Sequence, residues 1–142
     1  MLLSVNNLTK EKIDKRTINW IFTSALSKLK IKNKKAEVSV AFVGDKAIKD
    51  LNRRYLKKNT VTDVLAFSEK EKAAQFPLKT GLLGEIIISV QQAKRQAKKL
   101  DHDLKQEIQI LFVHGLLHLI GYDHINIKEK GLMDKVTKMI LR

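Results

Sequence analysis

The sequence predicts a single α+β domain, residues 1–142, in which a small mixed sheet of about four strands packs with about five helices. Short segments rich in β-branched residues alternate with segments whose apolar residues recur at the helical period. After residue 89, three helical patterns follow one another. A chain of 142 residues with 44% hydrophobic content is enough for one domain with an ordinary core.

The first half of the chain shows the pattern strand, helix, strand, helix. Residues 2–7, LLSVNN, form a candidate short strand, and residues 37–43, EVSVAFV, alternate in the manner of a half-buried strand. Asp45 stands where it can cap a helix that runs through about Tyr55. The helix between the two strands has the apolar stripe Ile18, Ile21, Phe22, Ala25, Leu26 and Leu29.

The middle of the chain predicts two further strands on either side of a loop. Residues 61–68, VTDVLAFS, and 82–90, LLGEIIISV, are rich in branched side chains. The intervening residues 69–81 contain the single proline, Pro77, and are predicted to be an exposed loop. Three helices follow: a basic one from about Ser89 to Leu100, a histidine-bearing one from about Leu104 to Ile120, and a last one that starts near Asn126, for which Asn126 and Glu129 form a capping pair.

Three of the four histidines lie within the segment HGLLHLIGYDH. His114 and His118 are four residues apart, which places both rings on one face of a helix. Gly121 can end that helix, so that the chain turns back and presents His124 to the same ion. Because imidazole suits zinc and three ligands leave one position open, the pattern predicts a catalytic site with one zinc ion per chain in this C-terminal-half helix, although nickel or cobalt would also fit.

Alternative interpretations of the histidines are weaker. Scattered polar residues on an amphipathic helix would not concentrate so densely, and a structural zinc site would need a fourth ligand in a chain without cysteine. The spacing also matches the HExxHxxGxxH zinc proteases, but Gly115 occupies the position of their general base, so peptide hydrolysis lacks its proton acceptor. We interpret the remaining histidine, His102, as a solvated residue at a helix start.

The charge of the chain predicts a polyanionic partner, with nucleic acid favoured over a membrane. Lys and Arg number 28 against 15 Asp and Glu, a net charge of +13. No segment is long enough to span a bilayer or resembles a signal peptide, and with no cysteine we expect a cytoplasmic protein. The cations cluster in three groups: Lys28, Lys30, Lys32, Lys34 and Lys35; Arg53, Arg54, Lys57 and Lys58; and Lys94, Arg95, Lys98 and Lys99.

The segments HGLLHLIGYDH, TDVLAF and LLGEIIIS, in that order and separation, resemble the signature segments of the YbeY family of bacterial endoribonucleases. The resemblance covers nearly the whole chain. It implies a small α+β fold and a zinc ion on His114, His118 and His124. It also implies single-strand-specific RNA cleavage in the maturation of the 3′ end of 16S ribosomal RNA, a role in ribosome quality control, and rRNA and the small ribosomal subunit as partners.

The chain departs from the family pattern at several positions. Where family members have the arginine of an LNxxYR segment, thought to assist catalysis or RNA binding, this chain has Leu56. Arg53 or Arg54 would then take its place, or activity would be reduced. A proline, a serine and a second proline of the family pattern are replaced by Val61, Ala66 and Ser68.

The mechanistic hypothesis combines a metal ion with nearby cations that offset charge on the phosphorus. Asp123 and Glu85 are candidate proton acceptors, and Arg53 and Arg54 are candidate cations. Two other classes stay open: a ribosome-associated RNA-binding factor with weak or no nuclease activity, and a metallohydrolase of peptides or small esters. The scissile bond, the oligomeric state and protein partners are left open by the sequence.

The ligand assignment predicts the effect of removing one imidazole. His118→Ala should abolish both bound zinc and RNA cleavage, with little loss of fold, because the ring is a ligand rather than a core residue. Elemental analysis measures the zinc content directly. Zinc content equal to that of the wild type would refute the assignment.

Overall fold

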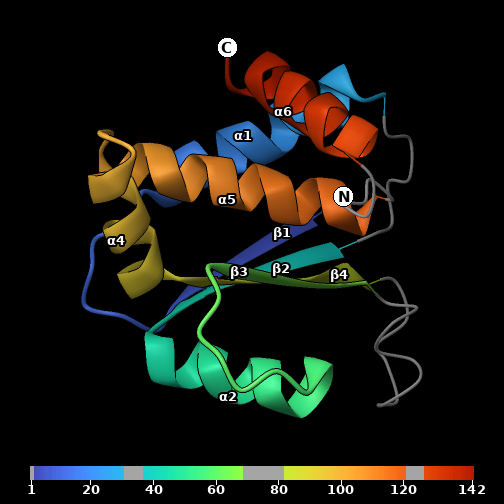
Figure 1. Cartoon of the computed structure of the whole chain (residues 1–142). Helices are drawn as coiled ribbons and strands as arrows, with labels where there is room; N and C mark the ends of the chain where they lie inside the picture. Colours follow the sequence, from blue (N-terminus) through green and yellow to red (C-terminus); the bar gives the residue numbers. More distant parts are fainter. Residues whose placement is uncertain (1, 31–36, 69–81, 121–126) are drawn as a thin grey trace.

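The computed structural model describes residues 2–30, 37–68, 82–120 and 127–142. Within these ranges the chain forms four strands and five helices. Figure 1 shows them in chain order, coloured from blue to red. Their bounds are β1 (Leu2–Asn7), α1 (Lys15–Lys28), β2 (Glu37–Val43), α2 (Asp45–Leu56), β3 (Val64–Ser68), β4 (Leu82–Ser89), α4 (Val90–Lys99), α5 (Leu104–Leu119) and α6 (Ile127–Leu141).

The strands form one mixed sheet in the order β1-β2-β4-β3. β2 pairs in parallel with both β1 and β4, and β3 pairs antiparallel with β4. Among the described helices, α1, α4, α5 and α6 lie on one side of the sheet and α2 lies on the other (Figure 1). The predicted α+β class, with about four strands and five helices, is confirmed.

The sheet separates two apolar cores. The larger core lies between the sheet and α5, and the smaller core lies between the sheet and α2. Along β4 the residues alternate between them, since successive strand residues face opposite sides: Ile86 and Ile88 enter the larger core and Ile87 the smaller. Because β4 is covered on both faces, it contains three consecutive isoleucines, residues 86–88, rather than an alternation of apolar and polar residues.

Two glycines bring α5 into close contact with the sheet. A Cβ at Gly115 of α5 would lie 2.7 Å from Cγ2 of Ile86, which is fully buried in β4. A Cβ at Gly84 of β4 would lie 2.4 Å from both Leu119 Cδ2 and the carbonyl oxygen of Phe67. The helix therefore lies closer to β4 than any side chain at these two positions would allow.

Side-chain caps begin three of the helices. Asp14 accepts hydrogen bonds from the backbone N–H groups at the start of α1, and its hydrogen bond from the Thr17 hydroxyl is the main cause that lowers its pKa. Ser89 caps α4 in the same way. Asp103 forms a capping box with Gln106 at the start of α5, which fixes where the histidine-bearing helix begins.

The prediction that Asp45 caps α2 is wrong. The N-cap is Gly44, and Asp45 is the first residue of the helix. Its carboxylate is instead bound by the guanidinium of Arg95, with both oxygen–nitrogen distances at 2.8 Å, and by the Ser89 hydroxyl at 2.9 Å. The hydrogen bonds from Arg95 are the main cause that lowers the pKa of Asp45.

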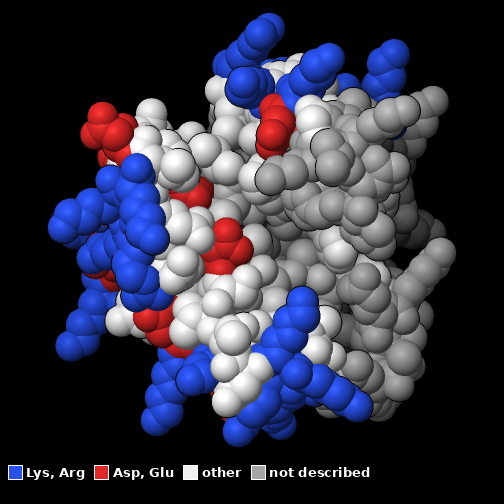
Figure 2. Space-filling model, viewed as in Figure 1, with Lys and Arg blue, Asp and Glu red and all other residues white. Residues whose placement is uncertain are grey.

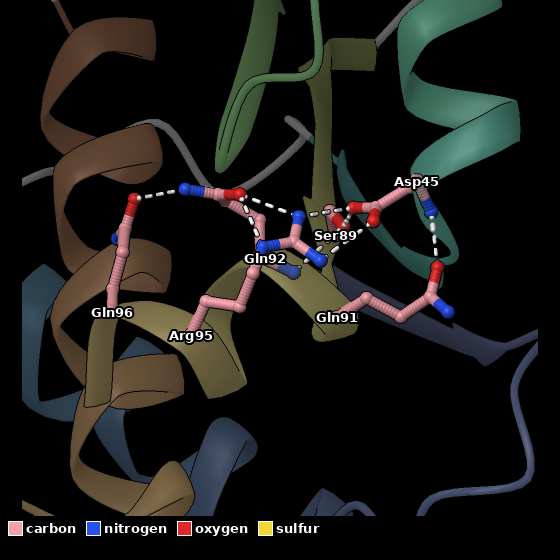
Figure 3. A network of polar contacts seen from close by, with 6 residues as sticks. All are labelled: Asp45, Ser89, Gln91, Gln92, Arg95 and Gln96. Carbon is pink, nitrogen blue, oxygen red and sulfur yellow. Dashed lines mark hydrogen bonds and ion pairs between the residues drawn. The ribbon is translucent and has the colours of Figure 1, made fainter. Parts of the chain in front are cut away.

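Figure 3 shows that Asp45 belongs to a polar network that joins α2 to the end of β4 and to α4. The Asp45 backbone N–H donates to Gln91 Oε1 at 2.7 Å, so α2 and α4 are joined through both backbone and side chain. Gln92 continues the network by donating to Gln96 at 3.1 Å. Exposed ion pairs of this kind add little stability, but they fix the relative position of the two helices.

The other predicted elements agree with the structure, except that the strand predicted from residue 61 begins at Val64. The apolar stripe of the first helix faces the larger core, and the strand at 37–43 has the predicted bounds. The basic helix and the histidine-bearing helix each end within one residue of the predicted limits. The loop at 69–81, the break at Gly121 and the Asn126 cap lie outside the described residues.

The contact of α5 with β4 predicts the effect of adding a methyl group. Gly115→Ala should lower the free energy of unfolding by about 1–3 kcal/mol, because the new Cβ overlaps buried Ile86. Chemical denaturation measures the change. The matched control is Gly131→Ala in α6, where no described atom lies within 4 Å of the new Cβ, and which should gain about 0.5–1 kcal/mol. Equal stability of the two variants would contradict the close approach.

Candidate functional site

His114 and His118 lie on the least buried strip of α5. Nine of the sixteen residues of this helix are buried. The half-buried positions Ile110, His114 and His118 follow one another every four residues, so they share one strip along the helix. The nine buried residues fix the other sides of the helix in the core, and the two imidazoles are therefore carried by a rigid element.

The end of α5 lies just before the predicted third ligand. The helix stops at Leu119, and the N–H of its cap, Ile120, donates back to carbonyl oxygens in the last turn. α5 therefore ends five residues before His124 in the sequence. Gly121, Asp123 and His124 lie outside the described residues, so the placement of the third ligand stays a prediction.

The donor set fits a metal ion in part. Two imidazoles spaced by one helical turn are a chemically suitable pair for zinc. Across the ranges that the structure describes, no group of three His, Cys, Asp or Glu side chains could hold a metal ion. A complete set of ligands would therefore need a donor from the segment that follows α5, where the sequence places His124.

A cavity of about 510 Å³ lies beside His114, between α5 and α6. Its walls combine apolar side chains with two cations and one carboxylate. The sequence motifs did not point to these residues of α6, because they have no distinctive spacing and contribute to the charge count as ordinary surface residues. The lining is Ile110 and His114 of α5 with Asp134, Thr137, Lys138 and Leu141 of α6 and the following Arg142.

Gly115 faces the sheet. Because Gly115 packs directly against Ile86, any side chain at residue 115 would enter the core between α5 and β4. A carboxylate at residue 115 would be buried against an isoleucine and would carry a large desolvation cost. The geometry therefore excludes a general base at the position where the zinc proteases have theirs.

Glu85 lies on the face of the sheet opposite to the histidines. Gly84 and Ile86, its neighbours in β4, both point toward α5. Because side chains alternate along a strand, Glu85 points toward the face that α2 covers, beside Ile87. The structure does not bring this candidate proton acceptor together with His114 and His118.

Arg53 and Arg54 also lie away from the histidines. Both are exposed on α2, beneath the sheet in Figure 1, while α5 lies above it. Both contact the carboxylate of Asp50 on the same helix. Leu56 ends α2 and is 49% exposed, so the arginine expected there from the family pattern would stand at the surface.

The prediction that His102 is solvated is wrong. Its side chain is 21% exposed, and Nε2 is hydrogen-bonded to Oε2 of Glu107. Glu107 is buried in α5 and needs partners, because an unpaired buried carboxylate is costly. Gln96 supplies another by donating to Glu107 Oε1 at 3.0 Å and to Asp63 Oδ2 at 3.2 Å. His102 therefore belongs to the interface between α4 and α5.

The surface is strongly basic over α2 and α4. Figure 2 shows lysine and arginine side chains gathered over these helices, with fewer acidic groups between them. A field of this sign attracts phosphate backbones. None of the helices that the structure describes is long and apolar enough to cross a membrane.

The fold and the site together define a small α+β protein whose histidine-bearing helix lies across a mixed sheet. The solution structure of TM1509 from Thermotoga maritima has a similar fold, with a TM-score of 0.60 and 22% identity over 97% of this chain and 88% of that one. The family model described as Endoribonuclease YbeY matches residues 4–142.

Curated relatives agree with the family model. Endoribonuclease YbeY of Listeria welshimeri is 37% identical over 150 residues, covering 99% of this chain and 91% of the relative. That of Aquifex aeolicus is 41% identical over 124 residues, covering 87% and 76%. The chain belongs to the endoribonuclease YbeY family and is a hydrolase that acts on RNA. The resemblance in the sequence is confirmed, and so is RNA as the substrate.

The cavity beside His114 predicts a role for Lys138 in the reaction with RNA. Lys138→Gln should lower kcat/KM for RNA cleavage by about tenfold, because the cavity loses a cation that would meet a phosphate. Steady-state cleavage of a fluorescent RNA measures the change. The matched control is Lys135→Gln, an exposed position on α6 that does not line the cavity. A similar loss in both variants would show a general charge effect and contradict the role.

Proposed function

We propose that the protein is a zinc-dependent, single-strand-specific endoribonuclease that acts in maturation of the 3′ end of 16S ribosomal RNA and in ribosome quality control. Its partners in this role are rRNA and the small ribosomal subunit. The observation that carries the proposal is a pair of half-buried imidazoles, one turn apart, on a helix that is fixed in the core. Family membership supplies the reaction class.

His114, His118 and His124 would hold the ion. When bound, zinc would polarise a phosphodiester oxygen and supply an activated water. The protein holds His114 and His118 in fixed positions, because nine residues of α5 are buried in the core. Rigid placement of ligands keeps the open position directed at the substrate.

Side chains of the cavity beside His114 would bind the substrate. Lys138 and Arg142 place positive charge where a phosphate can lie next to the imidazole. Ile110 and Leu141 offer an apolar surface for a base or ribose. Asp123, beside a ligand in the sequence, stays the candidate proton acceptor, since Glu85 faces the other side of the sheet.

The alternative of a peptide or ester hydrolase loses support. Zinc proteases need a carboxylate directly after the first histidine. In this chain that position is Gly115, which packs against Ile86 of the sheet. Replacement of the glycine by glutamate would disturb the core without placing a base near the open position.

The alternative of an RNA-binding factor with weak nuclease activity keeps one specific observation in its favour. Leu56 stands at the exposed end of α2 where family members carry an arginine. Arg53 and Arg54 are not equivalent to the missing arginine, because both are paired with Asp50. Measured RNA cleavage therefore distinguishes the endoribonuclease from the RNA-binding factor.

An RNA cleavage assay with and without a chelator tests the proposal. Single-stranded RNA should be cut, duplex RNA should not, and EDTA should abolish the reaction. Leu56→Arg should raise the rate by about tenfold if the guanidinium assists at the phosphate. The matched control is Leu100→Arg, which adds the same charge at a position 62% exposed at the end of α4.

Two results would contradict the proposal. RNA binding without cleavage by the wild type or by Leu56→Arg, in protein that contains zinc, would select the binding factor. Cleavage that EDTA leaves unchanged would remove the metal from the mechanism. An equal gain from Leu56→Arg and Leu100→Arg would assign the effect to added charge rather than to the position.

A further inference from the structure

Three cations form a stripe along the outer face of α2. Lys46, Lys49 and Arg53 are spaced by three and then four residues, which aligns them on one side of a helix over about 10 Å. All three are exposed. The opposite side of the helix carries the buried residues Ile48, which packs in the smaller core, and Asn52, which donates to the Thr60 carbonyl oxygen at 3.0 Å. The stripe therefore points to solvent along its whole length.

The stripe lines a groove of about 830 Å³. Asn59, from the segment after α2, lines the groove together with the helix. Asp50 lines it too, but its carboxylate is engaged by Arg53 and lies 3.8 Å from Arg54. The charge left in the groove is that of Lys46 and Lys49, so the groove is positive and large enough for a nucleotide.

The lysines of the groove carry unpaired charge. On α4, Lys94 is paired with Glu11 and Arg95 is bound by Asp45, whereas Lys98 and Lys99 are in none of the ion pairs of the described residues. Among the ion pairs of the described residues, none involves Lys46 or Lys49. Unpaired exposed lysines keep their charge available for a ligand, and a phosphate that binds them displaces only counterions.

The position of the groove separates it from the histidines. α2 lies on the sheet face opposite to α5, yet both helices run in the same direction and end at the same side of the sheet (Figure 1). β3 is the edge strand between them. An RNA that contacts both the histidines and the stripe on α2 would therefore have to extend from one face of the sheet to the other.

We propose that the groove along α2 binds the phosphate backbone of the RNA substrate at nucleotides remote from the cleaved bond. The charge and the exposure of the stripe favour RNA over an acidic protein, because RNA is the substrate of this enzyme and its phosphates repeat along a line as the cations do. The inference needs only an RNA substrate. It holds whether or not the histidines bind zinc.

Binding of RNA to Lys46→Gln/Lys49→Gln tests the inference. In the presence of EDTA, fluorescence anisotropy should show a Kd about fivefold or more above wild type for a single-stranded RNA of about twenty nucleotides. The slope of log Kd against log salt should fall by about 1.4, since two contacts at about 0.7 each are lost.

The matched control is Lys15→Gln/Arg16→Gln, which removes the same charge from exposed positions at the start of α1. Equal weakening by the two double variants would reduce the effect to net charge and overturn the inference. Unchanged RNA binding in Lys46→Gln/Lys49→Gln would also overturn the inference. An acidic protein would then be the alternative ligand of the groove. In cleavage assays the expected change is in KM for the long RNA, with kcat unchanged.

Discussion

The close contact between α5 and β4 is the constraint on which the rest of the structure depends. Gly115 lets the helix approach the Ile86 side chain, and Gly84 lets the strand approach the Leu119 side chain, so at each point the backbone of one element packs directly on a side chain of the other. Interiors packed at this density allow little movement. The contact therefore fixes both the height and the rotation of α5, and the rotation decides which strip of the helix stays open.

The same contact explains how the fold limits the chemistry. With Gly115 turned to the sheet, His114 and His118 remain on the half-buried strip, next to the cavity formed with α6. A ligand spacing shared with zinc proteases is kept, while the position of their general base is used for packing. Cations line the cavity beside His114 and the groove along α2, and positive charge of this kind attracts phosphate groups, which agrees with the family to which the chain belongs.

Much of the fold could be predicted because its signals are local. Helical periodicity gave the stripe of α1, and the apolar runs gave β3 and β4. The pairing of His114 with His118 on one strip followed from their spacing.

Features that depend on how distant elements pack against one another could not be predicted. The face to which Glu85 points depends on which alternate residues of β4 pack against α5. The ion pair between Asp45 and Arg95 joins residues fifty positions apart in the sequence. His102 was misjudged because its partner, Glu107, is a buried acid within a helix, and nothing in its neighbourhood in the sequence marks it as buried.

X-ray absorption at the zinc edge, on protein loaded with one equivalent of zinc, tests the central claim most directly. That claim is that α5, held against β4, presents two imidazoles to an ion completed by a third from the segment after the helix. The account predicts three imidazole nitrogens at about 2.0–2.1 Å and one further oxygen ligand that exogenous anions can replace. A closed shell of four protein ligands, or a spectrum with fewer than three imidazoles, would contradict it.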